Sequence, residues 1–297
     1  MKISMKNLNS TFDGFKNVIN MHHMMATCKD TICEIDMSDV KWIDANMCAP
    51  LGGVIQFNIS ENKITNIILK NVKPRIQDIL QKNGFLPNFG FDVEKKPDTY
   101  GTTIEYQRFG CMDSQSFKRY IEKHFRGKGI PDMTPRLSQK FRESISEIFE
   151  NAIDHSKTQV GIFACGQYFP AQERLDFSIA DLGIGFRENI SNCLGKHFAP
   201  EEAIEWALEG MNTTRKPKNG KPGGFGLKLI KEFLKLNNGG IDIISDAGYW
   251  SFKQGQIYKN RFKAPFPGTM VNIEINTSDA QSYYLESEGI IDVEDIF

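Results

Sequence analysis

The chain has 297 residues, of which 40% are hydrophobic and 25% are charged, a balance typical of a globular protein large enough for two domains. Its 36 basic and 37 acidic residues nearly cancel, so no net field favours nucleic acid or an anionic membrane as a partner. The opening MKISMKNLNS lacks the apolar core of a signal peptide, and no apolar stretch is long enough to cross a bilayer.

The first hundred residues alternate strand-like and helix-like segments. Two strands and two helices are predicted, the strands at residues 31–37 and 66–70 and the helices at residues 47–57 and 74–81. The alternating stretch 102–109 closes this pattern. We therefore expect a small α/β domain over residues 1–110.

A boundary between domains follows this first unit. A predicted helix at residues 114–125 leads into the loop RGKGIPDMTP, whose glycines and prolines are typical of a linker. We place the linker at residues 111–131 and a second domain at residues 132–297.

The second domain opens with the clearest helix of the chain. Thr134 is a favourable N-cap, Pro135 fits the first helical position, and apolar residues recur at helical spacing from Leu137 to Ala152. Further helices are predicted at residues 200–208 and 226–236, and strands at residues 159–164, 175–180, 240–245, 249–263 and 269–275. Helices beside an antiparallel run of strands predict a two-layer α/β sandwich.

Three polar residues lie along one stripe of that first helix. Glu147, Asn151 and Asp154 are spaced i, i+4 and i+7, beside the apolar face and not opposite it. A carboxylate in this position could orient a water for attack on a phosphate, and an amide oxygen could ligate magnesium. The alternative is the solvated polar edge of an ordinary amphipathic helix.

An acid and two glycines follow the predicted strand 175–180. Asp181, Gly183 and Gly185 form a D-x-G-x-G run, and glycines there suggest a backbone that approaches a ligand closely. The carboxylate could accept a hydrogen bond from the exocyclic amine of adenine. The alternative is a glycine turn between two elements.

A second glycine turn precedes the helix predicted at residues 226–236. It contains Gly223, Gly224, Gly226 and Leu227, and the N-terminus of a helix offers free N–H groups and a positive dipole to phosphate. The P-loop consensus is absent. Farther along, Thr269 precedes the strand-like MVNIEI, where its hydroxyl could reach an adenine nitrogen or a bridging water.

The order and spacing of these four elements resemble those of the Bergerat-fold ATPases, the superfamily of gyrase B subunits, MutL-type repair proteins, histidine kinases and anti-sigma-factor kinases. The resemblance covers about residues 130–278. Glu147 and Asn151 are similar to the N box, Asp181 with its two glycines is similar to the first glycine box, and residues 223–227 are similar to the second.

The resemblance implies a role for each matching residue. Asn151 would hold magnesium, Asp181 would recognise adenine, and Glu147 would be the general base of hydrolysis. The other positions implied to bind ATP are Asp154, Gly183, Gly185, Gly223, Gly224, Gly226, Leu227 and Thr269. Residues 187–222 would form the ATP lid, although Lys228 stands where many relatives carry glycine.

The first domain resembles, more weakly, a STAS domain, the fold of anti-sigma-factor antagonists. Residues 40–46, VKWIDAN, are similar to the strand that leads to the Asp-Ser-Ser/Thr-Gly site of that family. Ala45 and Asn46 replace its hydroxyl residues. The resemblance therefore implies a docking module without the phosphoacceptor of the family, and an unrelated small α/β domain is the alternative.

Three hypotheses for the function follow. The first is a regulatory protein that binds ATP and magnesium and hydrolyses ATP slowly, which switches its association with a partner protein or with a second copy of the chain. The second is a protein-serine kinase of the anti-sigma-factor type, and the third is a non-catalytic ATP-binding module. The six cysteines show neither a CxxC pair nor zinc-ligand spacing, so we expect reduced thiols in a cytoplasmic protein.

Overall fold

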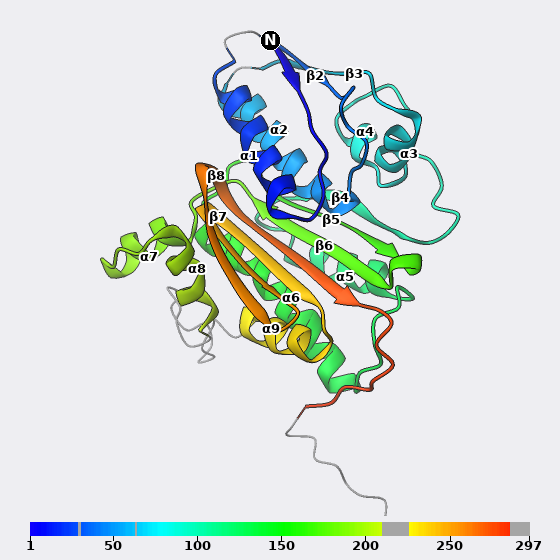
Figure 1. Ribbon diagram of the computed structural model, residues 1–297, viewed down its shortest axis with the longest axis vertical. Helices are drawn as coiled ribbons and strands as arrows, with labels where there is room; N and C mark the ends of the chain where they lie inside the picture. The colour runs from blue at the N-terminus through cyan, green and yellow to red at the C-terminus, as the bar shows by residue number, and fades with distance from the viewer. Residues whose placement is uncertain (29–30, 63, 210–225, 286–297) are drawn as a thin grey trace, which may run out of the picture.

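The computed structural model describes residues 1–28, 31–62, 64–209 and 226–285. In this part of the chain, helices and strands form two separate sheets (Figure 1), which confirms the predicted mixed α/β class. Among the described residues, one sheet has three strands in the order β1-β2-β3, and the other has five in the order β4-β5-β6-β8-β7. The three-stranded sheet is parallel and the five-stranded sheet is antiparallel.

The parallel sheet belongs to the first half of the chain. Its strands are β1 (Lys2–Ser4), β2 (Ile32–Asp36) and β3 (Asn66–Lys70). Parallel neighbours need a crossover connection, and helices α1 (Phe12–Ala26) and α2 (Cys48–Glu61) supply the two crossovers. The short helix η1 (Ala45–Met47) leads into α2, and helices α3 (Pro74–Lys82) and α4 (Phe85–Asn88) follow β3. The two strands and two helices predicted for this half are confirmed.

The antiparallel sheet carries most of the helices of the second half. Its strands are β4 (Thr103–Phe109), β5 (Ile162–Phe169), β6 (Arg174–Asp181), β7 (Gly240–Lys253) and β8 (Gln256–Asn276). The helices are α5 (Ser114–Phe125), α6 (Pro135–His155), α7 (Phe186–Leu194), α8 (Pro200–Leu208) and α9 (Gly226–Leu236), and the short η2 (Pro170–Gln172) joins β5 to β6. The predicted cap of α6 is confirmed, because the Thr134 hydroxyl accepts a hydrogen bond from the Leu137 N–H at 3.2 Å.

The structure differs from the predicted domain boundary at residue 110. Strand β4, assigned by sequence to the first domain, pairs with β5 in the second sheet, with Thr103 opposite Gln167 and Phe109 opposite Ile162. Helix α5, assigned to the linker, contributes Phe117 and Tyr120 to the core of the second half. An alternating strand fits either sheet equally well, so only the pairing over more than fifty residues decides where it belongs.

The end of the second sheet also differs from the prediction. The stretch predicted as one strand at residues 249–263 is a hairpin, in which Lys253 pairs with Gln256 across the two-residue turn Gln254-Gly255. Both turn residues have positive φ, at 51° and 76°, as a tight hairpin turn requires. Strands β7 and β8 are therefore long neighbours and not three separate strands.

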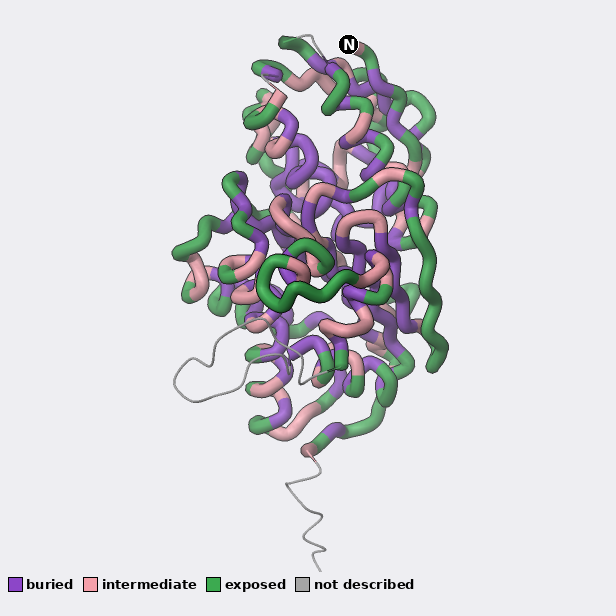
Figure 2. The backbone as a smooth tube through the Cα atoms, turned by 90° about the vertical axis from the view of Figure 1, so that its left-hand side faces the viewer, coloured by how far each residue is buried: buried purple, intermediate pink, exposed green. Residues whose placement is uncertain are grey.

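Both faces of the five-stranded sheet are covered. Helices α5, α6 and α9 pack on one face, while α1 and α2 of the first half pack on the other (Figure 1). Seen from the side, buried backbone runs through the middle of the molecule between these layers (Figure 2). A two-layer sandwich was predicted for the second half, but the second face of its sheet shares a core with the first half, which includes Phe15, Phe163 and Met270.

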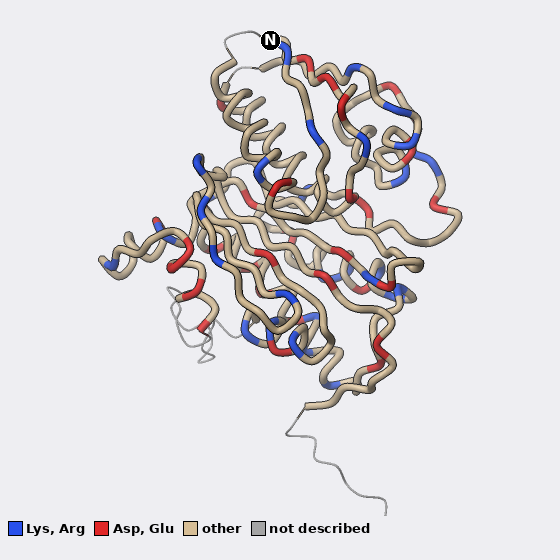
Figure 3. The backbone as a smooth tube through the Cα atoms, in the orientation of Figure 1, with Lys and Arg blue, Asp and Glu red and all other residues tan. Residues whose placement is uncertain are grey.

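No helix among the described residues is both long and apolar enough to cross a membrane. Acidic and basic residues are interspersed over both halves of the chain (Figure 3). Several of them nevertheless lie on strands at the interface between the halves, where burial makes them costly unless they are paired.

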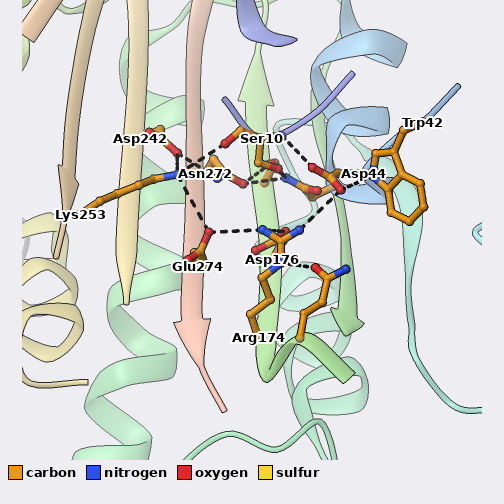
Figure 4. A network of polar contacts seen from close by, with 12 residues as sticks. Ser10, Trp42, Asp44, Arg174, Asp176, Asp242, Lys253, Asn272 and Glu274 are labelled. Atoms are coloured by element: carbon orange, nitrogen blue, oxygen red, sulfur yellow. Dashed lines mark hydrogen bonds and ion pairs between the residues drawn. The ribbon is translucent and has the colours of Figure 1, made fainter. Parts of the chain in front are cut away.

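A buried polar network joins the two halves (Figure 4). Asn46, in η1 just before α2, is fully buried, and its side-chain nitrogen lies 2.8 Å from Ser10 Oγ, 3.1 Å from Ser178 Oγ and 2.7 Å from Asn272 Oδ1. Asp44 accepts hydrogen bonds from the backbone N–H of Ser10 and from the indole N–H of Trp42. The network fixes the first half on β6 and β8 by directional contacts as well as by apolar packing.

Asp176 lies in the same interface and is fully buried. Neither of its carboxyl oxygens has a hydrogen-bond partner in the described part of the chain, and Arg174 lies 3.4 Å away. Burial raises the pKa of Asp176 to about 8, Arg174 and Lys253 oppose this rise, and Glu274 and Asp44 add to it. The interface therefore holds a neutral carboxyl group at neutral pH.

The raised pKa of Asp176 predicts a pH-dependent stability. The folded chain keeps this proton up to about pH 8, whereas the unfolded chain releases it near its ordinary pKa of 3.8, so the free energy of unfolding falls as pH rises between these values. Asp176→Asn, which is always neutral, should become progressively more stable relative to wild type from about pH 5 to about pH 8.5. Urea denaturation at several pH values measures this difference.

Asp39→Asn is the control for this experiment. Lys6 lowers the pKa of Asp39, so its titration lies below the tested range and its effect on stability should be the same at every pH. A constant difference between Asp176→Asn and wild type across the range would show that Asp176 is ionised in the folded protein.

Candidate functional site

One pocket collects most of the residues singled out in the sequence. It lies on the face of the antiparallel sheet that α6 covers, between α6, the C-terminal end of β6, Thr269 and Val271 of β8, helices α7 and α8, and the first turn of α9. The predicted site residues that line it are Glu147, Asn151, Asp181, Gly185, Leu227 and Thr269. These positions come from four separate parts of the chain, and the fold brings them together.

One side of helix α6 lines the pocket. At about 100° per residue, its pocket residues occupy one continuous arc of the helix surface: Glu147, Asn151, His155, Ile148 and Ala152. Asp154 falls about 20° outside the arc, on the far side of Glu147, and it is exposed and does not line the pocket. His155, the next residue, lines the pocket.

Asp181 ends β6 at the floor of the pocket. Burial raises its pKa well above the ordinary value, while hydrogen bonds from the backbone N–H groups of Thr269 and Gly183 act in the opposite direction. Its Oδ1 is buried and has no hydrogen-bond partner in the described structure. A ligand in the pocket that brings a hydrogen-bond donor would therefore satisfy Oδ1.

The glycines near Asp181 allow separate backbone segments to pack closely against one another. A Cβ at Gly183 would lie 2.0 Å from the carbonyl oxygen of Ser156, and one at Gly268 would lie 2.1 Å from the carbonyl oxygen of Asp181. Gly183 does not line the pocket, so its close approach is to the end of α6 and not to a ligand. Gly185 does line it, and a Cβ there would meet Ser245 Oγ at 2.5 Å.

The second glycine turn is described only in part. Gly223 and Gly224 lie outside the described residues, as does the part of the expected lid from residue 210 to residue 222. Leu227 lines the pocket, and a Cβ at Gly226 would lie 2.9 Å from Glu147 Cβ. The start of α9 is thus packed directly against the α6 residue predicted to act as a base.

Several pocket residues were not predicted from sequence. Phe186 and Asn189 come from α7, Trp206 comes from α8, and Ser245 of β7 contacts the pocket residue Thr269. Helix α7 has only two buried residues, Asn189 and Ile190, so no strong apolar periodicity marks it. Ser245 is an ordinary polar residue in a strand-like stretch, and only the pairing of β7 with β8 shows its role.

The pocket is mostly apolar with a few polar groups. Ile148, Ile179, Leu227 and Val271 form much of its wall, and Asp181 and Thr269 supply polar atoms. Its cavity measures about 90 Å³, whereas sites that enclose a whole drug-sized ligand measure about 300–1,000 Å³. The cavity therefore has room for a single ring system, and the rest of a larger ligand would extend past Glu147 and Leu227.

The protein oxygen atoms beside the cavity could bind magnesium only together with a bound ligand. The described residues contain no group of three or more His, Cys, Asp or Glu that could hold a metal ion. Magnesium is commonly bound by one or two protein oxygens together with substrate phosphates and waters. Asn151 could supply such an oxygen, so these residues fit magnesium that arrives with phosphates and do not form a metal cage by themselves.

Gly268 offers a test of this geometry. Gly268→Ala would force a Cβ against Asp181, at a residue whose φ is +149°. We expect it to lower the free energy of unfolding by on the order of 3 kcal/mol, measured by urea denaturation. Gly195→Ala is the matched control, because its φ of +63° carries backbone strain without any atom within 4 Å, and about 1 kcal/mol is expected. Equal losses would mean that the close approach at Gly268 carries no cost.

Comparison with known proteins identifies no family for this chain. A scan against models of protein families finds no match, and a search of curated proteins finds no significant relative. The function is therefore argued from the geometry of the pocket.

Proposed function

We propose that the chain is a regulatory protein that binds ATP with magnesium through a Bergerat-type unit and hydrolyses it slowly. The observation that carries this proposal is Oδ1 of Asp181, a buried acceptor without a partner at the floor of an apolar cavity. A buried polar atom without a partner is costly, and the exocyclic amine of adenine supplies the missing donor. The apolar walls and the size of the cavity suit the base of a nucleotide.

The polar groups at the mouth of the cavity support the proposed binding of the ATP phosphates and magnesium. The base would lie against Asp181 and Thr269, which directs the phosphates toward Asn151, Glu147 and the start of α9. Asn151 would hold magnesium through its side-chain oxygen, and the ion would neutralise phosphate charge. Glu147 would hold the attacking water and accept its proton, as a positioned carboxylate can.

The interface between the two halves supports a switching role. Ile179, Asp181, Thr269 and Val271 face the pocket, while Ser178 of β6 and Asn272 of β8 hold Asn46 of the first half. A ligand that shifts β6 relative to β8 would therefore disturb the contacts of the first half. We infer that a STAS-like first half transmits the state of the pocket to a partner protein or to a second copy of the chain.

Phosphorylation of the first half by its own pocket is disfavoured. Asn46, which stands where the STAS family has its phosphoacceptor region, is fully buried on the face of the sheet opposite Asp181. A phosphoryl group in the pocket would have to cross the sheet to reach it. A kinase activity would need a separate protein as acceptor, and labelled phosphate on such a protein identifies it.

The six free cysteines, four of them buried, support a cytoplasmic location.

The first test is nucleotide binding. Calorimetry with magnesium and ATP should give a Kd between about 1 μM and 1 mM. Asp181→Asn should weaken ATP roughly fivefold to a hundredfold, because an amide NH₂ facing the amine of adenine leaves a buried donor without an acceptor, which costs about 1–3 kcal/mol. Asp154→Asn, on an exposed residue outside the pocket, should bind like wild type. A folded wild-type chain without affinity for ATP would refute the proposal.

The second test separates binding from hydrolysis. Glu147→Ala should lower phosphate release by about 10²–10⁴-fold, the usual contribution of a positioned base, and should leave the Kd for ATP nearly unchanged. Glu143→Ala, one turn earlier on α6 and exposed, is the control and should retain wild-type turnover. If wild type binds ATP without releasing phosphate, the protein is a binding module; if Glu147→Ala turns over normally, another group is the base.

A further inference from the structure

Three pocket-side residues lie in one row across three strands. Asp181 of β6 is directly opposite Thr269 of β8, and Thr269 is directly opposite Ser245 of β7. Side chains in such a row point to the same face of a sheet. Asp181 and Thr269 line the pocket, while Ser245 lies behind Thr269 and is 1% exposed.

The side chain of Ser245 has two hydrogen-bond neighbours in the described structure. Its oxygen accepts a hydrogen bond from the backbone N–H of Phe186 at 2.9 Å and lies 3.1 Å from Thr269 Oγ1. A serine hydroxyl has a single hydrogen to donate, and Thr269 Oγ1 is the acceptor within reach in the described structure. Either hydroxyl group can be the donor in this contact. If Ser245 donates, its hydrogen has an acceptor and the hydrogen of Thr269 can point away from Ser245, into the pocket.

We propose that Ser245 is a positioning residue that makes Thr269 a hydrogen-bond donor toward a ring nitrogen of the bound base. This inference rests on the proposed binding of ATP. Asp181 then presents an acceptor and Thr269 presents a donor, side by side at the floor of the pocket. Adenine offers the complementary pair, an amine beside an acceptor nitrogen, whereas guanine offers a carbonyl beside an N–H and opposes both groups.

The same contact shapes the turn that follows Asp181. Ser245 holds the backbone of Phe186 at the N-terminus of α7, and Gly185 has no room for a Cβ because Ser245 Oγ would lie 2.5 Å from it. Ser245 thus connects the base-contacting row to the pocket wall formed by Gly185 and Phe186. Ser245→Ala would remove this hydroxyl without adding atoms.

The experiment compares ATP with 1-deaza-ATP, in which the ring nitrogen N1 is replaced by C–H. Wild type should bind ATP roughly threefold to tenfold more tightly than the analogue, the effect of one neutral hydrogen bond. The ratio should fall toward one in Ser245→Ala and in Thr269→Val, and the double variant should lose no more than either alone. A purely structural role for Ser245 would weaken both ligands equally and leave the ratio unchanged.

Ser178→Ala is the matched control, because Ser178 lies on β6 but faces the first half. It should lower stability and keep the wild-type ratio. Should Ser245→Ala fail to fold, Ser245→Cys keeps nearly the same shape with a weaker donor, and an intermediate ratio is expected. Binding of ATP with an unchanged ratio in the Ser245 variants would overturn this inference alone, as would equal binding of both nucleotides by wild type. Absence of ATP binding by wild type would overturn the proposed function itself.

Discussion

The pairing register of β6 with β8 is the constraint on which both the pocket and the docking of the first half depend. Asp181 lies opposite Thr269 and Ser178 lies opposite Asn272. Because side chains alternate across a strand, this register sends the first pair to the pocket and the second pair to Asn46. A slip of one residue would exchange the faces, which would place Asp181 against the first half and remove the acceptor from the pocket.

Two buried aspartates of β6 show how opposite faces of one strand serve different purposes. Burial raises the pKa of both Asp176 and Asp181. Asp176 is enclosed between the two halves near Arg174 and Glu274, where a neutral carboxyl group limits the excess of negative charge. Asp181 instead lines the pocket, and its Oδ1 has no hydrogen-bond partner in the described structure. A ligand that brings a donor would offset part of the cost of its burial.

The polar interface between the halves explains how a ligand could be sensed at a distance. Apolar helices on an apolar sheet could pack in several orientations, whereas Asn46 finds its acceptors in one arrangement. Two of those acceptors, Ser178 and Asn272, lie on the two strands that carry Asp181 and Thr269, so the pocket and the interface share a rigid element. Coupling between them needs no separate pathway through the molecule, because movement of either strand changes both sites.

The sequence by itself determined the mixed α/β class, most helices and strands, and the local motifs around Glu147, Asn151, Asp181 and Leu227, because helix caps, periodicity and glycine turns are local properties. It did not determine that β4 and α5 belong to the second half, that the second face of the sheet is buried, or that Asp154 lies outside the pocket. The role of Ser245 was likewise not predicted. Each of these features depends on strand pairing or on the rotation of a packed helix. Both are set by contacts between residues far apart in the chain, so they cannot be predicted from any single segment of the sequence.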